Sequence, residues 1–166
     1  MCRETLKRVV LAEAEALQVI AERISDSYLE AVEVIQGCRG RVICCGVGKS
    51  GHVARKTAGT LASTGTPSLF LHASEAVHGD LGMVTEKDVV LVYSYSGETD
   101  EIVRLFPSFK DIGAKTIAIT GRDGSSAGKL SDIVVNVFVE EEACPNNLAP
   151  TTSTTAMMAV SDALAV

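Results

Sequence analysis

The spacing of apolar and polar positions changes once along the chain, close to Gly40. Before that point, from Glu4 to Gln36, apolar residues recur at roughly helical spacing, and neither proline nor glycine interrupts them. This pattern predicts an amphipathic helical arm over residues 1–37. The polar run Ser25–Ser27 is placed to end one helix and begin a second. We expect the arm to pack on its own domain or on a second subunit.

After Gly40, short runs rich in β-branched residues alternate with helical patterns. Such alternation predicts an α/β fold over residues 41–166, a three-layer αβα sandwich with a five-stranded parallel sheet. The predicted strands are Arg41–Cys45, Ser68–Leu71, Val89–Ser94, Lys115–Thr120 and Ile133–Val137. The predicted helices are Gly51–Thr64, Ser74–His78, Glu98–Ile112, Ser125–Leu130 and Thr152–Val166. The last has no capping residue, so the chain is expected to stop inside or just after a helix.

Composition narrows the class of protein. Of 166 residues, 46% are apolar and 4% aromatic, enough for one domain with an aliphatic core. The net charge of −6 argues against a nucleic-acid partner, and no apolar run approaches the length of a membrane span. The five cysteines lack metal-binding spacing and are typical of buried thiols in a reducing cytosol. We therefore expect a cytoplasmic protein with no metal.

Two glycine- and hydroxyl-rich loops each follow a predicted strand and precede a helical pattern. The first is Gly46–Gly51, with the sequence GVGKSG, and the second is Ser94–Thr99, with the sequence SYSGET. A strand that turns tightly into a helix points free N–H groups and the positive end of the helix dipole at the turn, which favours phosphate binding. The two loops together predict a phosphorylated small molecule held between them.

Other interpretations of these loops are weaker. The first loop matches the dinucleotide fingerprint G-x-G-x-x-G, but the nearest acidic residue, Glu75, lies beyond the second strand, which disfavours a nicotinamide cofactor. A nucleotide-triphosphate loop would need its first glycine at Ile43. In the second loop, three hydroxyl groups exceed the single one that a serine-rich helix cap requires, and this favours phosphate binding.

Ionisable side chains near the loops each have a chemical and a structural interpretation. Lys49 could neutralise charge on a substrate oxygen or be an ordinary exposed lysine, and His78 could be an acid–base group or a helix cap. Glu101 is typical of a solvated helix carboxylate. The run Glu140–Glu142 is typical of a solvated end, yet it falls at the sheet edge where open α/β folds bind ligands. Hydroxyl residues after it, such as Ser153, could face the same cleft or cap the last helix.

Several segments together resemble a known family. They are Gly46–Gly51, Thr64–Pro67, Ala76–Met83, Ser94–Thr99, Ala118–Gly121 and Glu142–Thr155. The chain resembles the sugar isomerase (SIS) domain and, more narrowly, the D-arabinose-5-phosphate isomerases of the KpsF/GutQ type, over nearly its whole length. The resemblance implies a single Rossmann-like SIS domain over residues 1–166 and a homotetramer. It also implies interconversion of D-ribulose 5-phosphate and D-arabinose 5-phosphate for Kdo and lipopolysaccharide biosynthesis, without a cofactor.

The resemblance also implies the site residues and their roles. The catalytic residues are Lys49, His78, Glu101 and Glu142. The substrate-binding residues are Gly48, Ser50, Ser94, Tyr95, Ser96, Gly97, Thr99, Thr151 and Ser153. In the expected mechanism a cis-enediol forms, with Glu142 or Glu101 as the carbon base and its basicity raised by desolvation. Lys49 would stabilise the enediolate, and His78 would handle a hydroxyl proton.

The sequence departs from the family pattern at three points. The family's further catalytic histidine, in a His-Pro-Gly-Gly segment, and its paired CBS regulatory domains are not reached before Val166. Tyr95 stands where relatives often have a smaller polar residue, and we expect it to narrow the pocket. Two alternatives stay open: a sugar-phosphate sensor module, and an isomerase for another phosphosugar such as a hexulose 6-phosphate or sedoheptulose 7-phosphate.

Overall fold

The computed structural model describes residues 2–166, and its centre is a five-stranded parallel sheet. The strands are β1 (Val42–Gly46), β2 (Ser68–His72), β3 (Val89–Tyr93), β4 (Lys115–Thr120) and β5 (Ile133–Asn136). The predicted α/β fold is confirmed. The strand order, β2-β1-β3-β4-β5, adds what the sequence pattern did not specify. It places β1 beside β3. From β1 the sheet continues to β2 on one side, and from β3 it continues to β4 and β5 on the other.

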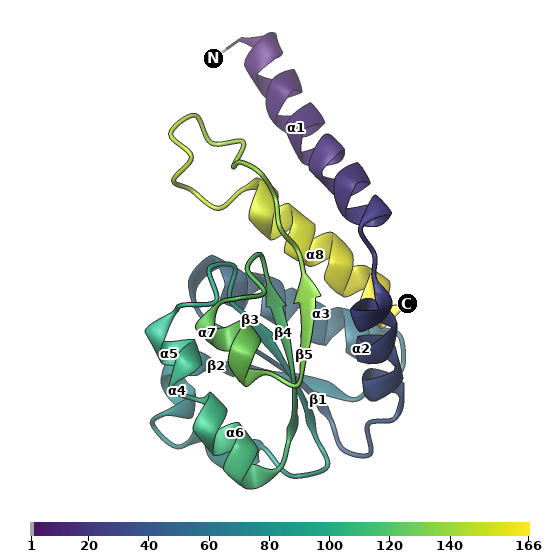
Figure 1. The fold of residues 1–166 in the computed structure, drawn as a ribbon, viewed down its shortest axis with the longest axis vertical. Helices are drawn as coiled ribbons and strands as arrows, with labels where there is room; N and C mark the ends of the chain where they lie inside the picture. Colours follow the sequence, from purple (N-terminus) through teal and green to yellow (C-terminus); the bar gives the residue numbers. More distant parts are fainter. Residues whose placement is uncertain (1) are drawn as a thin grey trace.

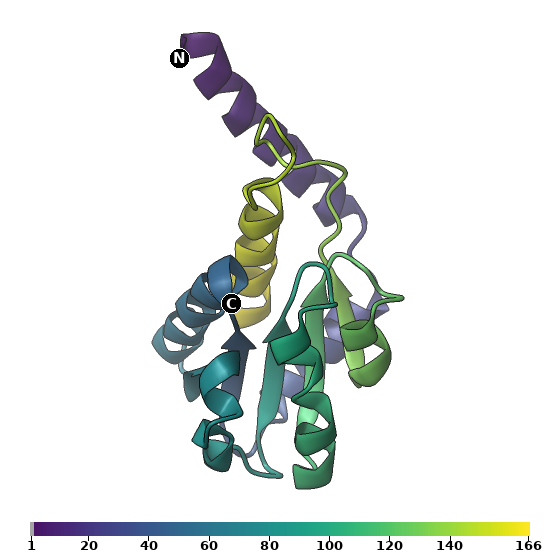
Figure 2. The same cartoon turned by 90° about the vertical axis from the view of Figure 1, so that its left-hand side faces the viewer.

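Helices cover both faces of the sheet (Figures 1 and 2). On one face lie α2 (Asp26–Gln36), α3 (Gly48–Ser63) and α8 (Thr152–Ala165). On the other lie α4 (Ala73–Ala76), α5 (Asp100–Val103), α6 (Phe106–Ile112) and α7 (Ser126–Leu130), with the 3₁₀ helix η1 (Asp80–Met83) after α4. The three layers agree with the prediction from strand–helix alternation.

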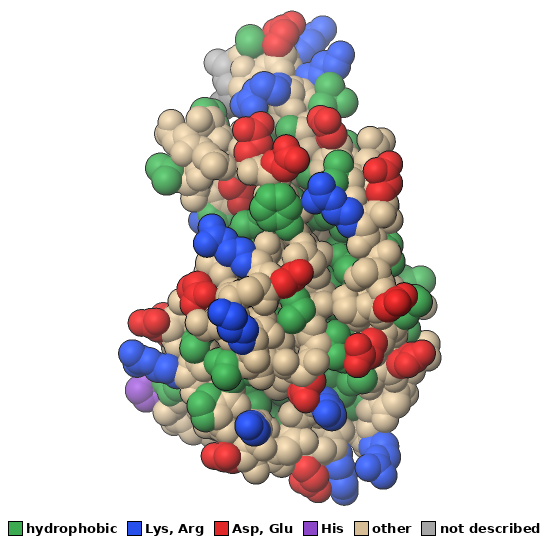
Figure 3. Space-filling model, in the orientation of Figure 1, with side chains coloured by type: hydrophobic (Ala, Val, Ile, Leu, Met, Phe, Trp, Pro, Cys, Tyr) green, Lys and Arg blue, Asp and Glu red, His purple; other side chains and the backbone are tan. Residues whose placement is uncertain are grey.

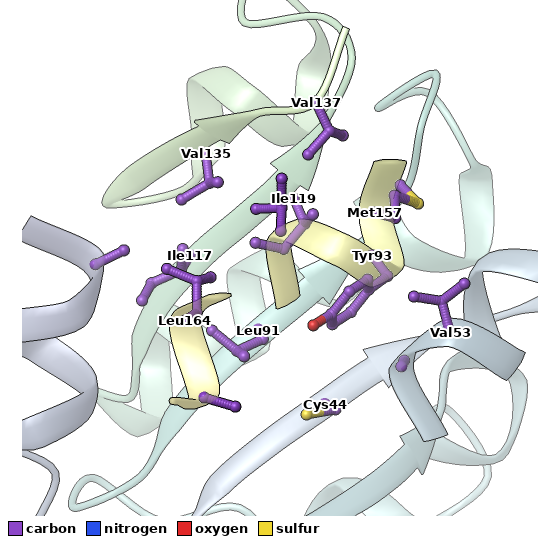
Figure 4. Packing of buried hydrophobic residues seen from close by; sticks show 14 of the residues in the cluster. Cys44, Val53, Leu91, Tyr93, Ile117, Ile119, Val135, Val137, Met157 and Leu164 are labelled. Atoms are coloured by element: carbon purple, nitrogen blue, oxygen red, sulfur yellow. The ribbon is translucent and has the colours of Figure 1, made fainter. Parts of the chain in front are cut away.

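The core follows the two-residue period of the strands. Leu91 and Tyr93 of β3 point to the α3 and α8 side, where Figure 4 shows them packed with Met157 and Val53, while Val90 and Val92 point to the α5 and α6 side. Because both faces are covered, the strands are apolar at nearly every position. The apolar strands therefore hold the polar loops at a rigid edge of the sheet.

The N-terminal segment forms two helices, as the polar run at Ser25–Ser27 predicts. The first, α1 (Arg3–Glu22), reaches beyond the body of the molecule along α8, and α2 packs on β5 (Figures 1 and 2). Apolar side chains near the start of α1 are exposed, with Leu6 at 61% and Val10 at 67%. The arm therefore packs on its own domain through α8 and leaves a second apolar stripe uncovered.

The predicted helix Glu98–Ile112 is wrong in one respect, because the structure divides it into α5 and α6. Pro107 lies in the first turn of α6. A proline in the interior of a longer helix would remove one hydrogen bond and clash with the carbonyl group of Val103. At the start of a helix its missing N–H has no cost, so α5 ends at Val103 and α6 begins at Phe106.

The two adjacent cysteines of β1 are buried on opposite faces of the sheet. Cys44 packs on the α3 side and Cys45 on the α5 side. Burial raises the pKa of the Cys45 thiol to about 12 and that of Cys44 further above its ordinary value, the latter helped by the neighbouring Cys45. Both are therefore protonated and unreactive at neutral pH.

The surface carries charges of both signs. Figure 3 shows Lys and Arg side chains interspersed with Asp and Glu over one face of the molecule. Within residues 2–166, each helix is too short or too polar to cross a membrane.

Candidate active site

The two glycine- and hydroxyl-rich loops begin side by side at the carboxyl edge of the sheet. Gly46, the last residue of β1, is the register partner of Tyr93, the last residue of β3. The chain leaves β1 toward α3 on one face and β3 toward α5 on the other. Open α/β sheets bind ligands at such a switch point, because the diverging loops leave a crevice. The structure thus brings together the two segments that the sequence predicts to share a ligand.

The first loop depends on close contact between strand and helix. A Cβ atom on Gly46 would lie 3.0 Å from the Cα atom of Gly51, so side chains at either position would push α3 away from β1. Gly48 has a φ of +59°, which favours glycine. The residue before α3, Val47, provides no side-chain cap. The first N–H groups of α3, which include those of Lys49 and Ser50, are therefore directed at the crevice.

Hydroxyl groups give the second loop its shape. The Ser94 hydroxyl is 3.0 Å from that of Thr99 and accepts a hydrogen bond from the Gly97 N–H at 3.1 Å. The Ser96 hydroxyl accepts one from the Glu98 N–H at 3.2 Å. The residue that precedes α5 is Thr99, and it makes no side-chain cap bond. The interpretation of this loop as a serine-rich helix cap is therefore wrong.

The second loop is attached to the start of α7. Gly97 has a φ of +67°, and a Cβ atom there would lie 2.0 Å from the Ser125 hydroxyl oxygen. Its carbonyl group accepts a hydrogen bond from the Ala127 N–H at 2.9 Å, and the Glu98 carboxylate accepts one from the Ser126 N–H at 2.9 Å. The bond from Ser126 lowers the pKa of Glu98. Sequence reasoning did not select Glu98, whose partner lies in a helix start 28 residues away.

The Tyr95 hydroxyl is engaged within the protein. It donates to the Val139 carbonyl oxygen and accepts from the Val139 N–H, both at 3.0 Å. Its ring lies against Gly121, where a Cβ atom would approach the ring to 2.5 Å. Burial raises the pKa of Tyr95, and the bond to Val139 offsets part of that rise. The structure therefore gives Tyr95 a connection to the segment after β5.

Glu142 lies at the start of α8 with its carboxylate surrounded by donors. It accepts hydrogen bonds from the Thr151 N–H at 2.8 Å, the Thr151 hydroxyl at 3.1 Å and the Ser153 N–H at 3.1 Å. The Ser153 hydroxyl is a fourth donor. Thr151 and Ser153, which the resemblance assigns to the substrate, thus contact Glu142 in this structure.

The pKa of Glu142 moves opposite to the expectation from its sequence context. Desolvation raises it, but the hydrogen bonds from Ser153 and Thr151 lower it by more, so the pKa lies below the ordinary glutamate value. The predicted rise in basicity is therefore wrong for this state of the protein. Glu142 is ionised throughout the neutral pH range.

Lys49, in the first loop, lies close to the start of α8. It lines a groove of about 270 Å³ between α3 and α8, together with Thr154 of the first turn of α8. The Lys49 side chain is exposed. The first loop and the segment that holds Glu142 are thus neighbours on the α3 and α8 side of the sheet.

His78 and Glu101 lie on the other side of the crevice. His78 is exposed in the turn after α4, and Glu101 is exposed in the single turn of α5. The helices α4 and α5 pack against each other. The four predicted catalytic residues therefore form two groups, one from each face of the sheet.

Across residues 2–166, the structure brings no three His, Cys, Asp or Glu side chains into an arrangement that could hold a metal ion.

Known proteins share this chain's sequence and fold. The SIS domain model matches residues 35–166. Arabinose 5-phosphate isomerase KpsF of Escherichia coli is 49% identical over 163 residues, which cover 98% of this chain and 50% of that protein. Arabinose 5-phosphate isomerase KdsD of Pseudomonas aeruginosa is 48% identical over 160 residues, covering 96% and 49%. The chain spans about half the length of these curated relatives.

A solved structure resembles the whole chain. A protein of E. coli CFT073, determined in complex with arabinose 5-phosphate, matches with a TM-score of 0.95 and 43% sequence identity, covering 99% of this chain and 90% of that one. The match to the SIS domain model covers the sheet and its loops, and the match to the solved structure also covers the helical arm. On both grounds, the chain belongs to the SIS domain family.

Proposed function

We propose that the protein is an aldose–ketose isomerase that interconverts D-ribulose 5-phosphate and D-arabinose 5-phosphate through a cis-enediol. The observation that carries this proposal is the pair of phosphate-type loops at the switch point, in a chain 43% identical to a protein determined with arabinose 5-phosphate. The product would supply Kdo for lipopolysaccharide. The five cysteines of the protein form no disulfide, which is consistent with a location in the reducing cytoplasm.

The substrate phosphate would bind between the two loops. The Ser94, Ser96 and Thr99 hydroxyls supply donors from the loop after β3, and the N–H groups of Gly48 and Ser50 supply donors from the start of α3. The Ser94 and Thr99 hydroxyls now bond to each other. Because hydroxyl groups can rotate, they can exchange this mutual bond for bonds to a phosphate.

Proton transfer needs a carboxylate beside the carbon acid, and Glu142 has a means of changing its basicity. Two of its four donors are the hydroxyls of Thr151 and Ser153, which can rotate toward sugar hydroxyls. Their departure would leave the carboxylate with two N–H donors and a higher pKa once the substrate is bound. This role combines the predicted contact of Thr151 and Ser153 with the substrate and their observed contact with Glu142.

The other predicted catalytic residues are placed to stabilise the charge of the enediolate and to transfer the hydroxyl proton. Lys49, at the positive end of the α3 dipole, would stabilise the negative charge of the enediolate. On the opposite side of the crevice, His78 would handle the hydroxyl proton. Glu101, on the same side, is the alternative carbon base.

The direct test follows ribulose 5-phosphate by NMR in D₂O, where arabinose 5-phosphate formation and deuterium incorporation at carbon both report the isomerisation. Replacing Ser94 or Ser96 by alanine removes a hydrogen bond to a charged group worth about 1.5–3 kcal/mol, so KM should rise roughly tenfold or more. Ser63→Ala is the matched control, since that hydroxyl donates to Gly59 in the last turns of α3. Thermal stabilisation by arabinose 5-phosphate without conversion would instead identify a binding module.

We also propose that the chain forms a homo-oligomer, a tetramer by similarity to its family. The exposed apolar side chains of α1, Leu6, Val10 and Leu11, offer a contact surface. Light scattering should report a mass above one chain for the wild type and a lower mass for Val10→Glu.

A further inference from the structure

Tyr95 connects two parts of the site that are distant in sequence. It stands between the two serines of the second loop, yet its hydroxyl group bonds to Val139, 44 residues away. One hydroxyl satisfies both the N–H and the carbonyl group of that residue. Val139 is buried and lies three residues before Glu142. The loop proposed to hold phosphate and the segment that carries Glu142 therefore share one side chain.

The other end of Tyr95 is equally fixed. Its carbonyl oxygen accepts hydrogen bonds from the Gly121 N–H at 3.0 Å and the Thr120 hydroxyl at 3.1 Å. Its ring lies so close to Gly121 that a Cβ atom there would come within 2.5 Å of it. Because the carbonyl group and the ring of Tyr95 both contact Thr120 and Gly121, the residue moves as one unit, so a displacement of the second loop also displaces the hydroxyl group and with it Val139.

The path continues from Val139 to the start of α8. Beyond Val139, the Ala143 N–H donates to the Thr152 hydroxyl at 2.9 Å, and the Glu142 carboxylate accepts from Thr151 and Ser153. The charge on Glu142 is also one of the influences on the Tyr95 phenol, which lies within its electrostatic range. The link from the phosphate loop to the carboxylate therefore consists of the two hydrogen bonds between Tyr95 and Val139, the main chain from Val139 to Glu142, and the hydrogen bonds around Glu142.

We propose that Tyr95 is a positioning residue that couples the binding of phosphate in the second loop to the placement of Glu142 at the start of α8. The inference rests on the proposed function, because it requires that this loop bind phosphate. A phosphate that draws in the Ser94 and Ser96 hydroxyls adjusts the backbone on both sides of Tyr95. The adjustment then changes the hydrogen bonds that the Thr151 and Ser153 N–H groups donate to Glu142.

The test is a titration of the ¹⁵N-labelled chain with inorganic phosphate, followed by NMR. In the wild type, the amide signals of Ser96 and Gly97 should shift, and those of Thr151 and Ser153 should shift at the same phosphate concentration. Shifts at the loop without shifts at Thr151 and Ser153 would overturn the coupling and leave the phosphate site standing. An unresponsive loop would overturn both proposals.

Two phenylalanine variants separate coupling from general loss of a hydroxyl group. Tyr95→Phe keeps the ring on Gly121 and removes only the two hydrogen bonds to Val139. It should keep the loop shifts and abolish those at Thr151 and Ser153. Tyr28→Phe is the matched control, because the Tyr28 hydroxyl donates from α2 to the carbonyl group of Asn136 at the end of β5. Tyr28→Phe should retain both sets of shifts, and retention of both in Tyr95→Phe would contradict the proposal.

Steady-state kinetics provide a second readout that folding alone would not move. Loss of the two positioning hydrogen bonds should lower kcat about tenfold in Tyr95→Phe while KM stays within about twofold of the wild type. Tyr28→Phe should leave both constants unchanged. A rise in KM with an unchanged kcat would identify Tyr95 as a direct substrate contact and would refute its positioning role.

Discussion

Two opposite edges of the sheet hold their carboxylates in almost the same way. At the amino edge, Asp132 accepts hydrogen bonds from the N–H of Thr116 at 2.8 Å and from its hydroxyl at 2.9 Å. At the carboxyl edge, Glu142 accepts the same pair from Thr151 and a second pair from Ser153. The pKa of each carboxyl group lies below its ordinary value, because these donors outweigh desolvation.

Asp88 repeats the arrangement at the amino edge. It accepts from the N–H of Thr85 at 2.7 Å, from its hydroxyl at 2.9 Å and from the Arg41 N–H at 2.6 Å, and it is only 5% exposed. A Cβ atom on Gly40 would come within 2.2 Å of its oxygen. A carboxylate held by a threonine is thus a general structural device in this protein. What distinguishes Glu142 is its place beside the two loops at the switch point.

The largest effect should therefore be on activity at the carboxyl edge. Glu142→Gln replaces an acceptor with an amide that cannot take a proton from carbon, so kcat should fall about a hundredfold or more. Asp132→Asn makes the same chemical change at the amino edge and should leave kcat unaffected. Conversion of ribulose 5-phosphate measured by NMR compares the two. A Glu142→Gln enzyme within threefold of the wild type would leave Glu101 as the carbon base.

Stability should respond in the opposite order. Asp88→Ala leaves the Arg41 and Thr85 N–H groups without their acceptor in a buried place, at a cost of about 2–4 kcal/mol in unfolding free energy. Glu142 is only partly buried, so water can replace it, and Glu142→Ala should cost less. Urea unfolding of both variants tests this order. A greater loss for Glu142→Ala would mean that Glu142 is primarily a structural residue.

Acid should weaken both edges. The pKa values of Asp132 and Glu142 are lowered by folding, so the folded chain binds fewer protons than the unfolded chain in the acidic range. Their contribution is fully present above the ordinary glutamate value of 4.5 and is lost as the pH falls through the lower folded values. Unfolding free energy should decline over this range. The decline should be shallower in a variant that combines Asp132→Asn and Glu142→Gln, and an unchanged slope would contradict the hydrogen-bond origin of these shifts.

The smallest effect concerns the ion pair that accompanies Asp132. Lys115 lies 3.1 Å from its carboxylate, but the two side chains are 65% and 40% exposed. Ion pairs of this kind contribute about 0–1 kcal/mol. Lys115→Met should therefore change the urea midpoint by little, with an unaltered kcat. A loss comparable to that of Asp88→Ala would show that the charge, rather than the Thr116 donors, holds Asp132.

The positions of the phosphate-type loops could be predicted because local rules determine them. A β-branched run followed by glycines and hydroxyl residues predicts a turn whether or not its neighbours are known. The break before α6 was equally local, since Pro107 alone requires it, and it could have been predicted from that residue. The N-terminal helices followed in the same way from their periodicity.

The contacts that assemble the site depend on the path of the chain in space. That β1 and β3 are neighbours follows from the strand order, for which the sequence pattern offered no signal. The donors to Glu142 return only after the loop Ala143–Pro150, so their effect on its pKa could not be inferred from the acidic run itself. The bond between Tyr95 and Val139 is of the same kind, because it joins segments that are brought together by β4 and β5.

The two adjacent free thiols of β1 can report when the sheet opens. Cys44 and Cys45 are buried and protonated, whereas Cys2 is exposed and Cys38 and Cys144 are partly so. An alkylating reagent should modify the latter three in the native protein and reach β1 only when the central strands separate. Mass spectrometry of the labelled peptides would then time the separation of the strands that support both loops.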